Sequence, residues 1–120
     1  MTHAELVTAA CMRALDVLDA SSLKFRPMQR KNHVNTRRGF VVGRTNIKTG
    51  LITIDIFTPK LIKPKKVSAI LRILCHEVAH HQKKPYRQRY RGHIITRSHY
   101  PIFYRQVTRN IKKLKRAGIL

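Results

Sequence analysis

The stretch VSAILRILCHEVAH, from Val67 to His80, decides how this chain is expected to fold. Its apolar residues recur at positions 67, 70, 71, 74 and 78, which is the spacing of one buried helical face. Pro64 suits the first turn of such a helix, and Pro85 prevents it from continuing. The sequence therefore predicts a mostly buried helix of about twenty residues in this part of the chain.

The same helix carries an H-E-x-x-H pattern, His76-Glu77-Val78-Ala79-His80. Two histidines four residues apart emerge on one face of a helix, about 6 Å apart along its axis. They can bind one Zn²⁺ there, with Glu77 beside them as a general base. A shuffled chain of this composition would contain the pattern roughly once in two hundred times. The buried helical context therefore decides against a chance pair of histidines on a solvated turn.

A catalytic zinc site normally takes three protein ligands, so a third ligand is needed. His81 directly follows the second motif histidine, about 100° round the helix, and cannot face the same metal. It is expected to be a solvated residue at the helix end. His93 and His99 remain as candidates for the third ligand. We favour His99 because it stands at the start of an expected final helix, which Phe103 would anchor against the core.

Two other arrangements of ligands are excluded by the residues present. The extended pattern H-E-x-x-H-x-x-G-x-x-H would need glycine and histidine where Lys83 and Tyr86 stand. A downstream carboxylate ligand is impossible, because no Asp or Glu follows Glu77. Histidine is therefore the natural third ligand.

The charge of the chain is strongly one-sided, with 26 Lys and Arg against 5 Asp and Glu, a formal net charge of +21. A field of this size attracts polyanions, above all nucleic acid. A basic surface without a specific partner is less expected, because ordinary soluble surfaces mix both signs. The best candidate patch comprises Lys83, Lys84, Arg87, Arg89 and Arg91, with Tyr86 and Tyr90 between them. The tyrosines could stack on unpaired bases, or the segment could be a disordered loop at the rim of the site.

The cysteines and the apolar runs indicate an intracellular protein. Cys11 and Cys75 both stand in apolar helical contexts, and the chain has no C-x-x-C pair that would form a zinc ribbon. Residues 1–20 contain three acidic residues and do not resemble a signal peptide. No apolar run approaches the ~18 residues of a membrane span. We expect a cytoplasmic or nucleoid-associated protein that makes no membrane contact.

The first half of the chain predicts a helix followed by a small antiparallel sheet. Residues 3–20 predict an amphipathic helix, and Thr2 could cap its start. Residues 24–38 are ambiguous and could begin with an edge strand. Runs 39–45 and 51–57 predict a β-hairpin, with Ile52, Ile54 and Ile56 on one face. Asp55 is expected to face solvent or a neighbouring arginine rather than to support the site.

The second half continues with residues 83–97, which are expected to be a long basic connection. Ser98 could cap a last helix that ends near Arg116. The buried face of this helix would comprise Phe103, Val107, Ile111 and Leu114. A chain of 120 residues with no internal repeat is expected to form one domain.

The motif Leu74-Cys75-His76-Glu77-Val78-Ala79-His80, followed by Ser98-His99-Tyr100-Pro101-Ile102-Phe103-Tyr104, resembles the SprT-like group of minimal zincins. This group includes Spartan-type proteases and the related YgjP-like and WLM proteins. The resemblance covers roughly residues 64–116. Its members follow the first motif with a histidine and, four residues later, a phenylalanine, which His99 and Phe103 match. This chain departs from the group at Tyr100, where a small residue is usual, and it lacks a following zinc ribbon.

The resemblance implies an α+β minimal zincin-like domain over residues 1–120, with an N-terminal helix, a small antiparallel sheet, the motif helix and a ligand-bearing C-terminal helix. It implies a Zn²⁺-dependent peptidase, with His76, His80 and His99 as metal ligands and Glu77 as the catalytic base. The Spartan resemblance further implies cleavage of proteins bound to DNA.

Two alternatives to the peptidase remain open. One is a small basic nucleic-acid-binding protein with a structural or absent metal. The other is a hydrolase of a non-peptide substrate such as a nucleotide, which ranks last because the chain has no phosphate-cradling glycine loop. A peptidase would also need a donor for the developing oxyanion, for which Tyr100, Tyr104 and His93 are candidates.

Overall fold

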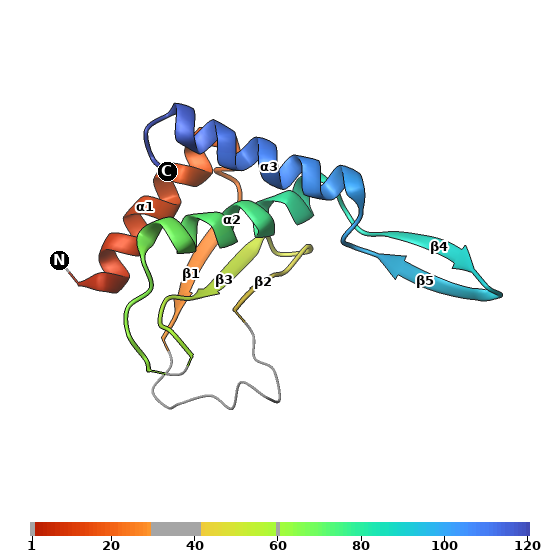
Figure 1. The fold of residues 1–120 in the computed structure, drawn as a ribbon, viewed down its shortest axis with the longest axis horizontal. Coiled ribbons are helices and arrows are strands. Elements are labelled where there is room, and N and C mark those ends of the chain that lie inside the picture. Colours follow the sequence, from red (N-terminus) through yellow and green to blue (C-terminus); the bar gives the residue numbers. More distant parts are fainter. Residues whose placement is uncertain (1, 30–41, 60) are drawn as a thin grey trace.

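The helices form one side of the molecule and a three-stranded sheet forms the other, while a separate hairpin projects from one end (Figure 1). The computed structural model describes residues 2–29, 42–59 and 61–120. Its elements are α1 (His3–Val17), β1 (Lys24–Met28), β2 (Gly43–Thr45), β3 (Leu51–Asp55), α2 (Val67–Gln82), β4 (Tyr86–Tyr90), β5 (His93–Arg97) and α3 (Pro101–Arg116). This order confirms the expected α+β layout, in which a helix, a small sheet, the motif helix and a C-terminal helix follow one another.

The first helix begins where the sequence predicts. The side chain of Thr2 accepts the backbone N–H of Glu5 at 3.1 Å, and the Glu5 carboxylate accepts the N–H of Thr2 at 3.4 Å. This reciprocal capping satisfies two of the free N–H groups at the helix start. The helix ends at Val17, three residues earlier than expected, and Asp19 then adopts a positive φ of 55°.

The sheet has the strand order β1-β3-β2. Strands β2 and β3 form the expected antiparallel hairpin, whose turn is fixed by the Asn46 side chain accepting the N–H groups of Lys48 and Thr49. Strand β1 lies at an edge, as Pro27 indicates, and pairs with β3 in parallel. Nothing in the sequence indicated that parallel pairing. Residues 30–41, which include part of the first expected hairpin strand, lie outside the described residues.

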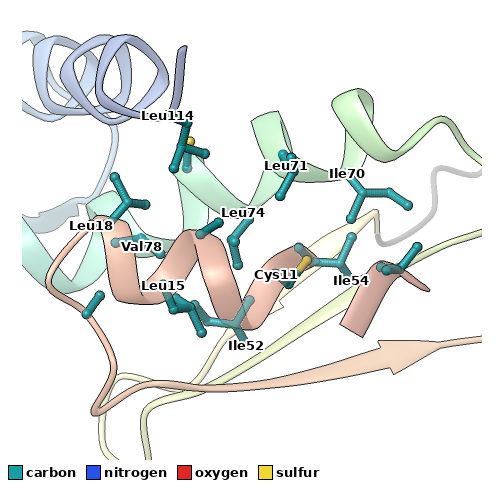
Figure 2. Close-up of a cluster of buried hydrophobic side chains, with 14 of the residues drawn as sticks. Cys11, Leu15, Leu18, Ile52, Ile54, Ile70, Leu71, Leu74, Val78 and Leu114 are labelled. Carbon is teal, nitrogen blue, oxygen red and sulfur yellow. The ribbon is translucent and has the colours of Figure 1, made fainter. Parts of the chain in front are cut away.

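The core lies between the sheet and the helices, with α1 and α2 packed on the sheet and α3 packed on α2 (Figures 1 and 2). The alternation in β3 is confirmed, because Ile52, Ile54 and Ile56 are fully buried. The expectation that Asp55 faces solvent was wrong, while its expected pairing with a neighbouring arginine stays a prediction. Its side chain is fully buried, and it accepts the N–H of Phe57 at 3.1 Å. The other main members of the core are Val7, Cys11, Leu15, Ile70, Leu71, Leu74, Val78 and Leu114.

The motif helix α2 spans 16 residues and buries the apolar face that its sequence predicts. It starts at Val67, so the expectation that Pro64 occupies its first turn was wrong. Pro64 instead pairs with Phe57 in an isolated bridge, and it precedes the helix by three residues. The helix ends at Gln82, before Pro85 could interrupt it.

The largest correction concerns the expected basic connection over residues 83–97, because residues 86–97 form a β-hairpin. Strands β4 and β5 pair in register through a two-residue turn at Arg91 and Gly92. Both turn residues have positive φ, 49° and 78°, as the tight hairpin turn that matches strand twist requires. The hairpin extends away from the helices and the sheet (Figure 1). Among the described residues, no helix is long and apolar enough to cross a membrane.

We expect the thiols of Cys11 and Cys75 to resist reaction with thiol reagents in the folded protein. Burial raises the pKa of both thiols from 9.0 to about 12, which leaves roughly a thousandfold less thiolate than in the unfolded chain. The pKa of each thiol is higher in the folded than in the unfolded protein, so burying the neutral thiols contributes fully to folding stability below about pH 9. This contribution is lost as the pH rises toward 12. Timed labelling with Ellman's reagent, with and without urea, measures the protection. Immediate reaction of both thiols in the folded protein would contradict their burial.

Candidate metal centre

The third histidine is supplied by the short segment that joins β5 to α3. Helix α3 starts at Pro101, which needs no N–H partner in the first turn, and Tyr100 is its N-cap residue. The expectation that Ser98 caps this helix was therefore wrong, and His99 precedes the helix. The Ser98 hydroxyl lies 3.1 Å from Nδ1 of His99. This contact engages Nδ1 and leaves Nε2 facing the motif helix.

His76, His80 and His99 converge on one point. One ligand nitrogen from each ring lies within 4.8 Å of the other two, and the group could hold a metal ion. The ring centroids are 5.0 Å apart for His76 and His80, 5.2 Å for His76 and His99, and 4.8 Å for His80 and His99. The Nε2 atoms of His76 and His99 are 3.3 Å apart. The predicted convergence is confirmed, while ligation of a metal stays a prediction.

The ring of Phe103 packs against the imidazole rings of all three histidines. Its ring is fully buried, and it stacks on His80 at a centroid distance of 4.4 Å and an interplanar angle of 24°. It also meets the rings of His76 and His99 edge-on, at 5.0 and 5.2 Å. One side chain thus fixes the positions of all three imidazoles, because each ring loses freedom against the same buried surface.

Asn110 locks α3 to α2, a role that the sequence analysis missed. Its buried side-chain amide donates to the backbone carbonyl of Cys75 at 3.1 Å and to the Gln82 side chain at 2.8 Å. It accepts from Gln106 at 3.0 Å. The signal in the sequence was a lone polar residue within the apolar stripe of the last helix, between Phe103 and Leu114. A buried amide whose groups are paired fixes one register between two helices, because any other register leaves it unpaired.

Glu77 lies between the motif histidines and the edge strand β2. It is only 6% exposed, and burial raises its pKa to about 7. Gly43 in β2 lies directly against it: a Cβ at Gly43 would be 3.3 Å from Glu77 Oε1 and 2.9 Å from Ile73 Cγ2. The close approach of strand and helix therefore depends on a residue without a side chain.

The motif histidines are held in the form that binds metals. Burial, followed by the neighbouring His99, lowers the pKa of His76. Burial, followed by the nearby histidines, lowers the pKa of His80 to about 4. Both rings are therefore neutral near pH 7, and a neutral imidazole offers a lone pair to a metal ion.

The remaining site candidates lie elsewhere. His81 hydrogen-bonds to Thr45 of β2, so it links the sheet edge to α2 and is not simply solvated. His93 is the first residue of β5, beside the hairpin turn. The rest of that strand carries it roughly 13 Å from the hairpin base, at a rise of about 3.3 Å per residue. The structure thus brings His99, and not His93, to the motif histidines.

The predicted basic patch falls on the projecting hairpin and on the turn that leads into it. Lys83 is the C-cap residue of α2, and Lys84 follows it. Arg87 and Arg89 are exposed on β4, and Arg91 stands in the turn. The hairpin therefore carries three of the five residues on an arm that the helices do not cover.

Two hollows meet at the metal centre. One has a volume of about 370 Å³ and is lined by Gly43, Thr45, His76, Glu77, His80 and His99, among others. The second, of about 660 Å³, shares Gly43, His76 and Glu77, and is otherwise lined mainly by apolar side chains. The histidines and the carboxylate are therefore open to a molecule larger than water, on both sides of Glu77.

Comparison with known proteins gives no match: no family model, no curated protein and no solved structure matches this chain.

We expect His99→Ala to weaken binding of one equivalent of Zn²⁺ or Co²⁺ by more than about a hundredfold, because it removes one of three converging donors. His93→Ala is the matched control and should bind metal as the unmodified protein does. Elemental analysis and competition with a chromophoric chelator measure both. Full metal content in purified His99→Ala would show that this histidine is not a ligand.

Proposed function

We propose that this protein is a zinc-dependent peptidase. The observation that carries the proposal is the distance between His76 and His99. Two nitrogens of a tetrahedral site, with zinc–nitrogen bonds of about 2.0–2.1 Å, lie roughly 3.3 Å apart. The Nε2 atoms of His76 and His99 are 3.3 Å apart. His80 supplies the third nitrogen, which leaves a fourth position for a reactant.

The donor set fits zinc and other transition metals rather than magnesium or calcium. Three imidazole nitrogens suit zinc, copper, iron or nickel, whereas magnesium and calcium prefer oxygen ligands. The three described ligand candidates include no carboxylate and no thiolate. Three protein ligands with an open position are typical of catalytic rather than structural zinc sites.

The proposed reaction is hydrolysis of a peptide bond. When bound, zinc would polarise the scissile carbonyl and make an attacking water more acidic. Glu77 accepts a proton from that water while the water oxygen forms the new bond to the carbonyl carbon. The same carboxyl then gives the proton to the amide nitrogen as the carbon–nitrogen bond breaks, so the proton count balances. Gly43 leaves room for this carboxylate beside the edge strand.

A further donor for the carbonyl oxygen is best sought at Tyr104. Its side chain is 53% exposed, and its ring centroid lies 6.2 Å from that of His99. Tyr100 is less suitable, because its hydroxyl already donates to the backbone carbonyl of Lys84 at 3.0 Å. His93 stands beside the hairpin turn, away from the metal centre.

The resemblance to SprT-like zincins supports a peptide substrate, because it rests on the same residues that converge in the structure. Both halves of that resemblance, the H-E-x-x-H helix and the later His99 with Phe103, meet at one place. The alternative, a basic nucleic-acid-binding protein with a structural metal, would leave the buried Glu77 beside the histidines without a role.

We expect Glu77→Gln to keep its zinc and to lose hydrolysis by about 10²- to 10⁴-fold, the usual contribution of a general base. The substrate would be an unstructured protein such as casein, with products identified by mass spectrometry and a chelator-treated sample as blank. Glu5→Gln, at the only other glutamate, is the matched control and should cleave normally. Zinc-dependent cleavage by Glu77→Gln at the unmodified rate would overturn the assignment of the base. If no zinc-dependent cleavage occurs in any sample, the basic binding protein becomes the better account.

The proposed partner of the basic surface is nucleic acid, and DNA is the probe for it. On one face of the hairpin, Arg87 and Arg89 pair across the strands with Thr96 and Ile94 and are exposed. On the other face, Tyr86 packs edge-on against Tyr100 at 5.0 Å, and Arg91 and Arg97 lie over the ring of Tyr90 at 5.1 and 5.5 Å. The tyrosines therefore have partners within the protein, which favours phosphate contacts by the arginine face over base stacking.

We expect the double variant Arg87→Gln, Arg89→Gln to bind a short DNA duplex about tenfold more weakly at low salt. The slope of log affinity against log salt concentration should become shallower by roughly two, one for each lost phosphate contact. The control is Arg13→Gln with Lys63→Gln, which removes equal charge far from the hairpin in sequence. Fluorescence anisotropy over a salt series measures both. Equal losses in the two double variants would mean that only total charge matters.

A further inference from the structure

We propose that the site recognises an acidic side chain of its substrate, through a cationic pocket formed by Arg26, Arg44 and Lys48 next to the metal centre. The inference deepens the proposed peptidase function and rests on it. The pocket has a volume of about 660 Å³ and lies on the sheet side of the cleft.

The two arginines gather on one face of the sheet because of the strand register. Thr53 in the central strand is opposite Arg26 in β1 and opposite Arg44 in β2. Residues directly opposite one another share a face of the sheet. Ile52 and Ile54 alternate to the other face and are buried in the core. The two guanidinium groups therefore extend from both neighbours of Thr53 on the side away from the helices.

The pocket is cationic and has no acidic residue in its described lining. Lys48 adds a third positive charge from the turn between β2 and β3. Arg26, Arg44 and Lys48 are all exposed, so a ligand can reach them. A carboxylate accepts two parallel hydrogen bonds from one guanidinium, which makes arginine a good receptor for Asp and Glu side chains.

The cationic pocket adjoins the hollow that contains the metal centre. Both are lined by Arg44, Thr45 and Ile47, so they meet around the edge strand β2. The hollow on the other side of Glu77 is less cationic, because Val42, Ile73 and Val107 line it together with a single arginine, Arg72. A chain held across the site would therefore meet three cationic side chains at one end of the cleft, and a mainly apolar surface with one arginine at the other.

A single carboxylate suits this pocket better than a nucleic-acid backbone does. The arginines gather around one threonine, whereas each strand of a duplex carries a phosphate about every 3.4 Å along its axis. The lining also includes Ile47 and Leu51, which offer apolar contact to the stem of an acidic side chain. The arginines of the hairpin, in contrast, are set along an extended strand.

The test uses binding to the Glu77→Gln protein, so it does not depend on turnover. The probes are dye-labelled alanine-serine peptides centred on one leucine, with a single Glu or Gln placed at each position in turn. We expect Glu to bind about fivefold more tightly than Gln at positions on one side of the leucine only, the size expected of exposed ion pairs. Arg26→Gln and Arg44→Gln should each reduce this ratio, and Arg44→Glu should instead favour a peptide with Lys at the same position.

The matched control is Arg13→Gln, which loses one charge on α1 and should keep the ratio. An equal preference for Glu at every position, or an equal loss in Arg13→Gln, would overturn the pocket and leave only the overall positive field. Displacement of the Glu peptide by a short oligonucleotide whose own affinity falls in Arg44→Gln would assign the pocket to nucleic acid. A clear one-sided preference without any zinc-dependent cleavage would keep the pocket and reject the peptidase.

Discussion

The contact between Phe103 and the three imidazoles is the interaction on which the candidate site depends. Two of the rings come from α2, and the third comes from the segment before α3, so no single element can position them. Phe103 touches all three while fully buried. Asn110 adds direction to this packing, because its amide is paired only when α3 lies in one register on α2. Packing brings the elements together, and the amide selects how they meet.

The sequence predicted those elements in which one buried face makes apolar residues recur at the spacing of a helix or a strand. The stripe of α2 and the alternation of Ile52, Ile54 and Ile56 were readable for this reason. His99 was identified as the partner of the motif histidines through Phe103, whose place one turn into the last helix suggested an anchor. The expectation placed His99 inside that helix, and Pro101 explains why the helix starts later.

The projecting hairpin could not be read in the same way, because most residues of β4 and β5 are exposed and no face is packed into the core. Without a buried face there is no alternation of apolar and polar residues to find. The remaining signal in the sequence was local: a glycine, Gly92, between two runs that contain tyrosine, isoleucine and threonine. The parallel pairing of β1 with β3 could not be predicted, because the sequence of a short edge strand does not indicate which strand it pairs with. The burial of Asp55 depends on the tertiary fold.

X-ray absorption at the metal edge of the zinc-loaded protein tests the central claim most directly, because it counts and identifies the atoms around the ion. The account predicts three imidazole nitrogens at about 2.0–2.1 Å and one further light atom in a four-coordinate shell. A sulfur shell at about 2.3 Å, a shell of six oxygens, or fewer than three imidazoles would contradict it.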